Sequence, residues 1–391
     1  YMRQDGVRVA VYDATNSTKN RRLHLLSTLE REGIGAKRMF LESICENEEL
    51  LEENIRTVKL STPDYQNVDP EEAVLDFKER RRQYASVYQT LDDSDGCSYL
   101  KIFDCKKFVV HNIRGYLPLK IVHFCMNLHT LSRTFYLTRH GQSKYNLLGR
   151  IGGDSGLSEN GLEYASRLAK YVEEEITNSK TNADALTAEP ITKKQVPARL
   201  WTSTLRRTKE TAQFIQHPTI KHTWDNGDTI EWVQMRPMHR RNLDEIYAGS
   251  MDGMTYKEIE EQFPEEFKRR QDDKLAYRYP RGESYMDVIL RLEPLAHEME
   301  RTREPIVIIG HQGIHRILYA YFMGLCREDA PYVSIPLNTV IQLTPHAYGC
   351  HEKRVCLMNK HEMLLDDGQD EPVTSMERAP TSFDVLNAPS H

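Results

Sequence analysis

Between residue 135 and about residue 350, short apolar runs alternate with amphipathic stretches, and this alternation constrains the fold more than any other feature of the sequence. The apolar runs predict buried strands, and apolar residues at helical spacing predict helices. Strands are expected at Phe135–Leu137, Arg199–Trp201 and Ile306–Ile309, and helices at Ser158–Ile176, Leu205–Ile215 and Tyr285–Arg301. The sequence therefore predicts an α/β fold, a three-layer sandwich in which a mostly parallel sheet lies between helices on both faces.

Polar and cationic side chains follow all three predicted strands. Arg139 and His140 follow the first strand, Arg207 begins the helix after the second, and His311 follows the third. Because ligands of parallel α/β sheets bind at the carboxyl ends of the strands, we expect these imidazoles and guanidinium groups to face one crevice. Packing alone explains the set poorly, since a buried cation is costly without a partner.

This set of side chains suits phosphoryl transfer, in which negative charge is spread over the equatorial oxygens. Arg139 and Arg207 can bind those oxygens in bidentate fashion, and His311 can add a donor. A neutral imidazole at His140 can attack phosphorus and form a phosphohistidine. The leaving alkoxide needs a proton from an acid, for which Glu245 is the candidate if burial raises the pKa of its carboxyl. This chemistry requires no metal ion.

The composition argues against several other classes of protein. With 39% hydrophobic and 28% charged residues, the 391-residue chain can form cores for two or three domains and is not a disordered polymer. A net charge of −6 argues against wholesale binding of nucleic acid. The chain has no apolar run of the roughly 18–20 residues that a membrane span needs, and its first residues are not a signal peptide. Seven scattered cysteines without a C-x-x-C pair argue against a disulfide framework or a zinc site, and they favour the cytoplasm.

Longer strings carry a resemblance to a known family. LTRHGQS at residues 137–143, with Asn146 and GRIGGDSGLS at residues 149–158, resembles the histidine phosphatase superfamily. YPRGESY at residues 279–285 and LTPHAYGC at residues 343–350 are similar to the bisphosphatase half of the 6-phosphofructo-2-kinase/fructose-2,6-bisphosphatase family. A plain phosphoglycerate mutase is not expected to carry these two strings. The resemblance extends to about residue 350.

The resemblance implies an enzyme that hydrolyses the 2-phosphate of fructose 2,6-bisphosphate through a phosphohistidine, giving fructose 6-phosphate and phosphate. It implies that His140 accepts the phosphoryl group, that Glu245 donates the proton, and that Arg139, Arg207 and His311 line the phosphate pocket. Residues that match positions binding the rest of the substrate are Asn146, Gly152, Tyr256, Arg270, Lys274, Arg278, Tyr285, Gln312 and Arg316. The partner implied is a small sugar phosphate, and the phosphatase needs no cofactor.

Three of these basic positions have a regular spacing. Arg270, Lys274 and Arg278 are four residues apart, so they share one face if the stretch is helical. A solvated basic face is the alternative explanation for such a run, and only the resemblance favours a phosphate site.

The sequence departs from the family pattern at three positions near the predicted site. Tyr247 stands where an acidic residue is usual, Gln142 where Glu is usual, and Gly310 where Cys is usual. The change at Tyr247 could alter the surroundings of Glu245.

Residues 1 to about 130 resemble the second half of the family's kinase domain, a P-loop-kinase-like α/β domain. A strand is predicted at Val7–Tyr12, directly before Asp13, which the resemblance places near Mg-ATP, and Lys59, Arg80 and Tyr84 match sugar-phosphate positions. The chain nevertheless contains no G-x-x-x-x-G-K-[ST] string to hold the nucleotide phosphates. We therefore expect a partial kinase domain without kinase activity, and Mg-ATP as a cofactor only if a segment upstream completes it.

The predicted organisation is a partial kinase domain over residues 1–130, a phosphatase domain over residues 134–350 and a loose tail over residues 359–391. One alternative is a related phosphoglycerate mutase or sugar-phosphate phosphatase. Another is a non-catalytic regulatory subunit that binds sugar phosphates or a full-length partner. The family is often dimeric through its kinase halves, which leaves a homodimer open.

Overall fold

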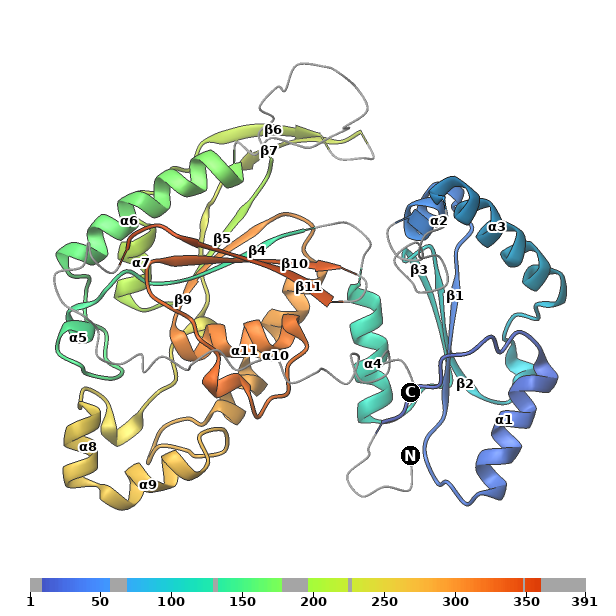
Figure 1. The fold of residues 1–391 in the computed structure, drawn as a ribbon, viewed down its shortest axis with the longest axis horizontal. Coiled ribbons are helices and arrows are strands. Elements are labelled where there is room, and N and C mark those ends of the chain that lie inside the picture. Colours follow the sequence, from blue (N-terminus) through green and yellow to red (C-terminus); the bar gives the residue numbers. More distant parts are fainter. Residues whose placement is uncertain are drawn as a thin grey trace. The chain divides into compact units, whose positions relative to one another are not determined.

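The computed structural model describes residues 9–56, 69–128, 133–177, 196–223, 227–346 and 349–359. The chain divides into two compact units, Tyr1–Thr130 and Leu131–His391 (Figure 1). Within the described ranges, no helix has the length and apolar character needed to cross a bilayer.

The first unit is built on a small mixed sheet with strand order β1-β2-β3, in which β1 and β2 are parallel and β2 and β3 form an antiparallel hairpin. Its elements are α1 (Lys19–Arg31), β1 (Met39–Ile44), α2 (Glu48–Asn54), α3 (Pro70–Val87), β2 (Ser98–Phe103), β3 (Lys107–His111) and α4 (Tyr116–Asn127). The guanidinium of Arg22 in α1 forms a buried ion pair with Asp95, at 2.8 Å. This pair connects the helix to the turn that precedes β2.

The strand expected at Val7–Tyr12 is wrong for the residues that can be compared. Residues 9–12 have no regular structure, and Val11 is 86% exposed. A strand requires a hydrogen-bonded neighbour, and none of β1, β2 and β3 pairs with this segment. The apolar run alone was therefore not sufficient to predict a strand here.

The second unit contains a six-stranded sheet with the order β11-β10-β4-β9-β5-β8. The four strands β4, β9, β5 and β8 are parallel, and the hairpin β10–β11 adds two antiparallel strands beside β4. The strands are β4 (Phe135–Arg139), β5 (Arg199–Thr202), β8 (Pro237–His239), β9 (Ile306–Gly310), β10 (Thr339–His346) and β11 (Gly349–Cys356), and a separate hairpin is formed by β6 (Thr219–Thr223) and β7 (Thr229–Val233). The prediction of a mostly parallel sheet is confirmed.

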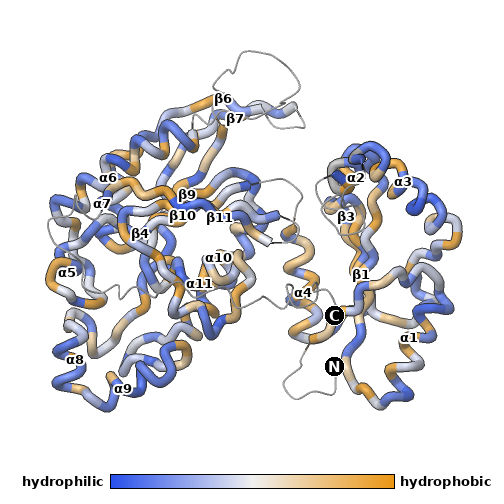
Figure 2. The backbone as a smooth tube through the Cα atoms, in the orientation of Figure 1, coloured by the Kyte–Doolittle hydropathy of each residue, from blue (hydrophilic) through white to orange (hydrophobic). Residues whose placement is uncertain are grey.

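Helices cover both faces of this sheet (Figure 1). Side chains alternate along β9: Ile306 and Ile308 pack in the core beneath α10 and α11, whereas Val307 and Ile309 pack in the core beneath α6 and α7. The helices are α5 (Lys144–Leu147), α6 (Glu159–Tyr171), α7 (Arg206–Ala212), α8 (Tyr256–Gln262), α9 (Pro264–Asp272), α10 (Tyr285–Arg301) and α11 (Gln312–Met323). Figure 2 shows the hydrophobic residues of the central strand β9. The prediction of a sheet between two layers of helices is confirmed.

Two of the three predicted helices agree closely with the observed ones, whereas the helix predicted at Leu205–Ile215 is observed only over Arg206–Ala212, as α7. The helix predicted from Tyr285 to Arg301 has the same bounds as α10, and Ser284 caps its N-terminus by accepting a hydrogen bond from the Asp287 amide. The helix expected at Ser158–Ile176 is α6, which Ser158 caps and which continues as a π-helix over Val172–Thr177. Apolar periodicity thus located these helices well.

Candidate active site

Four adjacent parallel strands end at one edge of the large sheet, and each is followed by a polar side chain of the candidate site. His140 follows β4, His311 follows β9, and Ser203 follows β5, while the chain leaving β8 reaches Glu245 after one turn of 3-10 helix. The backbone amide of His140 donates to the carbonyl oxygen of Gly310 at 3.0 Å, which joins the ends of β4 and β9. The topology therefore brings together residues that are more than 170 positions apart in sequence.

His140 is arranged as a neutral imidazole with one available nitrogen. It is only 5% exposed, and burial, followed by the charges of Arg207 and Arg139, places the pKa of His140 well below 6.5. Its Nδ1 lies 2.7 Å from the carbonyl oxygen of Gly141. Because a carbonyl oxygen only accepts, Nδ1 carries the proton and Nε2 keeps the lone pair that a nucleophile needs.

His311 lies directly beside His140. The two ring centroids are 5.1 Å apart, and His311 is fully buried, so that burial and nearby Arg207 place its pKa well below 6.5. Its Nε2 is 2.8 Å from Oγ of Ser203, whereas its buried Nδ1 has no hydrogen-bond partner among the residues that the structure describes. A buried polar atom without a partner is a candidate contact for a ligand.

Two buried guanidinium groups lie next to these imidazoles. Arg139 is 8% exposed and donates from Nη1 to the carbonyl oxygen of Ile335 at 3.1 Å. Arg207 is 4% exposed and donates from Nη1 to the carbonyl oxygen of Gly153 at 2.7 Å. The amide of Gly153 in turn donates to both carboxylate oxygens of Asp252 at 3.1 Å. The loop after α5 therefore positions Arg207 through its backbone.

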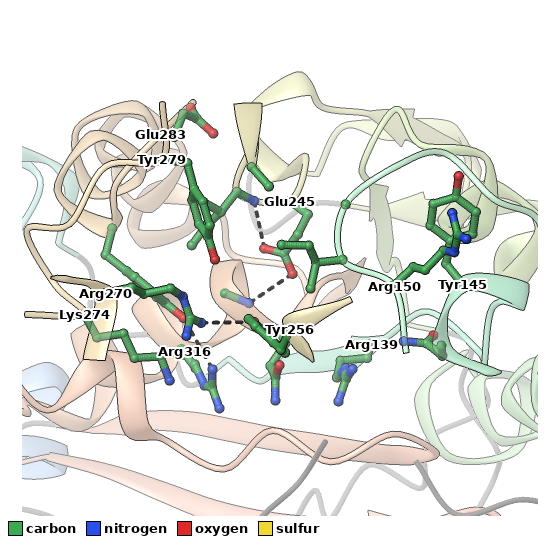
Figure 3. A pocket seen from close by; sticks show the side chains of 18 of the residues that line it. Arg139, Tyr145, Arg150, Glu245, Tyr256, Arg270, Lys274, Tyr279, Glu283 and Arg316 are labelled. Carbon is green, nitrogen blue, oxygen red and sulfur yellow. Dashed lines mark hydrogen bonds between the residues drawn. The ribbon is translucent and has the colours of Figure 1, made fainter. Parts of the chain in front are cut away.

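The carboxylate of Glu245 is fixed by two backbone amides. Oε1 accepts from the amide of Ile246 at 2.9 Å, and Oε2 accepts from the amide of Gly313, in the first turn of α11, at 3.2 Å (Figure 3). Burial is the main cause that lowers the pKa of Arg207. The negative charge of Glu245 is the strongest of the effects that oppose this lowering. The carboxyl group is therefore close enough to the guanidinium of Arg207 to act on its charge, and it is oriented by the start of a helix.

A second group of cations lines the same cavity. Figure 3 shows Arg270, Lys274 and Arg316 near one another, and among the described residues no carboxylate lies within 4 Å of their charged nitrogens. Arg270 donates to the hydroxyl of Tyr256 at 3.0 Å, and the ammonium of Lys274 lies 5.0 Å from the ring centre of Tyr332. Burial, followed by the charges of Arg316 and Arg270, lowers the pKa of Lys274 from 10.5 to about 7. Such a cluster requires an anion for compensation.

The predicted site residues meet in one cavity of about 930 Å³, counting the part open to solvent. Its walls include four of the five predicted catalytic residues, and the fifth, His311, lies against His140. Of the nine predicted substrate contacts, eight line it: Asn146, Gly152, Tyr256, Arg270, Lys274, Tyr285, Gln312 and Arg316. The spatial arrangement expected from the three strand ends is therefore present.

Arg278 is the predicted substrate contact that the structure places elsewhere. It does not line the cavity, and its side chain is 63% exposed and forms an ion pair with Asp287. The condition for one shared helical face is not met, because α9 ends at Asp272 and the run from Arg270 to Arg278 continues beyond it. Lys274 reaches the cavity from the turn that follows the helix.

Several residues of the site had no predicted role. Ser203, which contacts His311, lies in the strand-ending segment that was singled out for its arginine. Glu283 and Tyr279 line the cavity and belong to the YPRGESY string, while Arg150 and Tyr145 line it from the loop around α5. Their motifs were recognisable, but contacts between distant parts of the chain define their positions.

Two of the three departures from the family pattern have visible compensations. The Oε1 atom of Gln142 accepts from the hydroxyl of Ser158 at 2.9 Å, which holds this side chain at the start of α6. A Cβ atom on Gly310 would lie 2.9 Å from Cε1 of His315, so the glycine leaves room for that buried imidazole. The side chain of Tyr247 is 53% exposed.

The residues matched to a kinase site do not form a nucleotide cradle in the described part of the first unit. Asp13 is exposed on a segment without regular structure, Arg80 forms an ion pair with Asp76 of its own helix at 2.9 Å, and Tyr84 is 53% exposed. Lys59 lies outside the described residues. Because the sequence also has no G-x-x-x-x-G-K-[ST] string, we assign no step to Mg-ATP.

Comparisons with known proteins match a family to each of the two units. The 6-phosphofructo-2-kinase family model matches residues 1–132, and the model of the histidine phosphatase superfamily (branch 1) matches residues 135–181 and 178–357. The 6-phosphofructo-2-kinase/fructose-2,6-bisphosphatase of Gallus gallus is 41% identical over 360 residues, which are 91% of this chain and 68% of that protein. The chain belongs to the 6-phosphofructo-2-kinase/fructose-2,6-bisphosphatase family.

Other relatives in the family differ in how much of their length is matched. The fructose-2,6-bisphosphatase of Saccharomyces cerevisiae is 40% identical over 353 residues, which are 89% of this chain and 69% of that protein. The Arabidopsis thaliana relative is 41% identical over 91% of this chain, but the match covers only 43% of its own length. The histidine phosphatase domain and these relatives support an enzyme with phosphatase activity.

Proposed function

We propose that the second unit hydrolyses the 2-phosphate of fructose 2,6-bisphosphate to fructose 6-phosphate and inorganic phosphate. The observation that carries the proposal is a single cavity with two cationic regions, one at Arg139 and Arg207 beside His140 and the other around Arg270, Lys274 and Arg316. A substrate with two phosphates on one small sugar suits such a cavity, because each dianion compensates one group of cations. The names of the relatives identify the sugar.

In the first step, Nε2 of His140 attacks phosphorus and the bond to the sugar oxygen breaks. Arg139, Arg207 and His311 stabilise the charge on the equatorial oxygens, and Glu245 gives its proton to the departing oxygen. The products of this step are fructose 6-phosphate and a phosphohistidine.

In the second step, water attacks the phosphohistidine and the bond from phosphorus to Nε2 breaks. The Glu245 carboxylate, now unprotonated, accepts a proton from that water, which restores both side chains and releases phosphate. Ser203 can support both steps: if its hydroxyl donates to Nε2 of His311, the other ring nitrogen carries a proton that it can donate to a phosphoryl oxygen.

We place this reaction in the cytoplasm. All seven cysteines of the chain are free thiols, which persist in a reducing compartment.

The direct test is the release of phosphate from fructose 2,6-bisphosphate by the wild-type chain and by His140→Ala. We expect release by the wild type and a loss of at least about 1,000-fold in the variant, because the nucleophile is removed. His217→Ala is the matched control, since this histidine is exposed and does not line the cavity. Equal rates for His140→Ala and the wild type would refute the proposal, and faster turnover of phosphoglycerate than of the bisphosphate would favour a mutase.

A further inference from the structure

We propose that Arg291 and Glu283 form a clamp that holds Glu245 in position for proton transfer. Here the clamp means the side chains of these two residues. This inference rests on the role of Glu245 in the proposed function. No motif of the sequence marks Arg291 as part of a site.

Arg291 binds both a carboxylate and the backbone of the segment that carries Glu245. Its Nε and Nη2 donate to the two carboxylate oxygens of Glu283 at 2.8 and 3.0 Å. Its Nη1 donates to the carbonyl oxygen of Asn242 at 2.6 Å, and its Nη2 also donates to those of Asp244 and Glu245 at 2.7 and 3.3 Å. One guanidinium group therefore fixes three backbone carbonyls within four residues.

Glu283 holds the same segment from its other end. Its Oε2 accepts from the amide of Tyr247 at 3.1 Å, and its own amide donates to the carbonyl oxygen of Tyr247 at 2.9 Å. Together, Arg291 and Glu283 bind the backbone on both sides of Glu245. Since Glu283 also lines the cavity, the clamp lies next to the place where the substrate is expected.

The segment needs such support because it has no regular secondary structure. After the 3-10 turn Arg241–Leu243, residues 244–248 belong to no helix or strand. The buried side chain of Leu243 anchors its start, and Asp244 accepts hydrogen bonds from the amide and hydroxyl of Thr204 at 2.7–2.9 Å. These contacts fix the beginning of the segment, whereas the clamp contacts the backbone on both sides of Glu245.

Position matters more for Glu245 than for a residue that only binds. A general acid contributes about 100- to 10,000-fold to the rate, and a displacement of about 1 Å can cost about 100-fold. Lysine cannot replace Arg291, because an ammonium group cannot reach a carboxylate and three carbonyls with the fixed geometry of a guanidinium. The clamp is therefore a positioning device whose loss should lower kcat and leave phosphate binding intact.

The experiment is a double-mutant cycle between Arg291→Lys and Glu245→Gln, with kcat and KM measured for fructose 2,6-bisphosphate. We expect Arg291→Lys alone to lower kcat by about 10- to 100-fold, while the inhibition constant for orthophosphate stays within about twofold. In the Glu245→Gln background the same substitution should have almost no effect on kcat, because no proton donor remains to be positioned. Glu283→Gln, which retains the side-chain shape, should reproduce the loss in kcat.

A second Arg-to-Lys substitution, away from the cavity, is the matched control for Arg291→Lys. Arg167→Lys removes an arginine of α6 that also joins a carboxylate, Glu163, to a backbone carbonyl, that of Leu357, away from the cavity. It should leave kcat unchanged, and thermal melts should show Arg291→Lys folded at the assay temperature.

The outcomes separate the clamp from the function of Glu245. Unchanged kcat in Arg291→Lys, or losses that multiply in the double variant, would overturn the clamp while leaving the proposed reaction in place. If Glu245→Gln itself retains wild-type kcat, Glu245 is not the proton donor, and both the proposed step and the clamp are refuted.

Discussion

The second group of cations makes substrate binding depend on pH through Lys274. Burial and the charges of Arg316 and Arg270 lower the pKa of Lys274 to about 7 in the ligand-free protein. A phosphate dianion bound beside it favours the ammonium form, so the pKa of Lys274 rises in the complex. Above pH 7 the free protein has lost this proton, and binding must take it up again. Affinity therefore falls as the pH rises through 7.

The size of the effect follows from the lowered pKa. Each pH unit well above 7 should weaken binding about tenfold, so Lys274 alone should raise the Kd for fructose 2,6-bisphosphate about tenfold between pH 6 and pH 8. At pH 8, binding should take up about 0.9 proton, because about nine-tenths of the free protein has Lys274 uncharged. The weakening by about tenfold per pH unit continues only up to the pKa that Lys274 has in the complex.

Calorimetry on His140→Ala measures this binding without turnover. Titrations at several pH values give Kd, and titrations in buffers of different ionisation enthalpy give the number of protons taken up. The matched control is Lys274→Arg in the same background, since a guanidinium stays charged at every pH used. The titration of the substrate is the same with both proteins, so the difference between them comes from Lys274. The same pH dependence in both proteins, or no uptake of protons at pH 8, would refute the reasoning.

Three further substitutions test individual contacts of the site. Ser203→Ala should lower kcat at least about tenfold and weaken inhibition by orthophosphate, because it leaves Nε2 of buried His311 without its 2.8 Å partner; unchanged steady-state kinetics would contradict this. Gly141→Ala should destabilise the fold by about 1–3 kcal/mol in denaturant melts, since its Cβ would lie 2.4 Å from the carbonyl oxygen of Gly161; an unchanged midpoint would show that the backbone yields. Arg278→Ala should leave KM for the bisphosphate within about twofold, because this side chain lies outside the cavity; a large rise in KM would restore its predicted role.

The sequence was most informative where chemistry follows a strand directly. His140, Arg207 and His311 were expected to meet because parallel strands end at one edge of a sheet, and the structure places the two imidazoles 5.1 Å apart. Helix α10 was located to the residue from apolar periodicity. These features depend on local patterns and on one general rule of topology.

Long-range contacts could not be predicted in the same way. Nothing in the local sequence of Arg291 indicates that its guanidinium binds carbonyl oxygens 46 to 49 positions earlier. The role of Ser203 depends on a ring nitrogen 108 positions away. The spacing of Arg270, Lys274 and Arg278 does not reveal that α9 ends six residues before Arg278. Likewise, an apolar run does not reveal whether a neighbouring strand exists, and residues 9–12 have none.

The central claim is that the Nε2 atom of His140 carries the phosphoryl group during turnover. The most direct measurement is rapid quenching of the enzyme with fructose 2,6-bisphosphate that carries radioactive phosphorus at the 2-position, followed by peptide mapping. We expect a label that is labile in acid, stable in base and confined to the peptide that contains His140, because its Nδ1 is occupied by the carbonyl oxygen of Gly141 and its Nε2 is available. Substrate turnover without any label on this histidine would contradict the account.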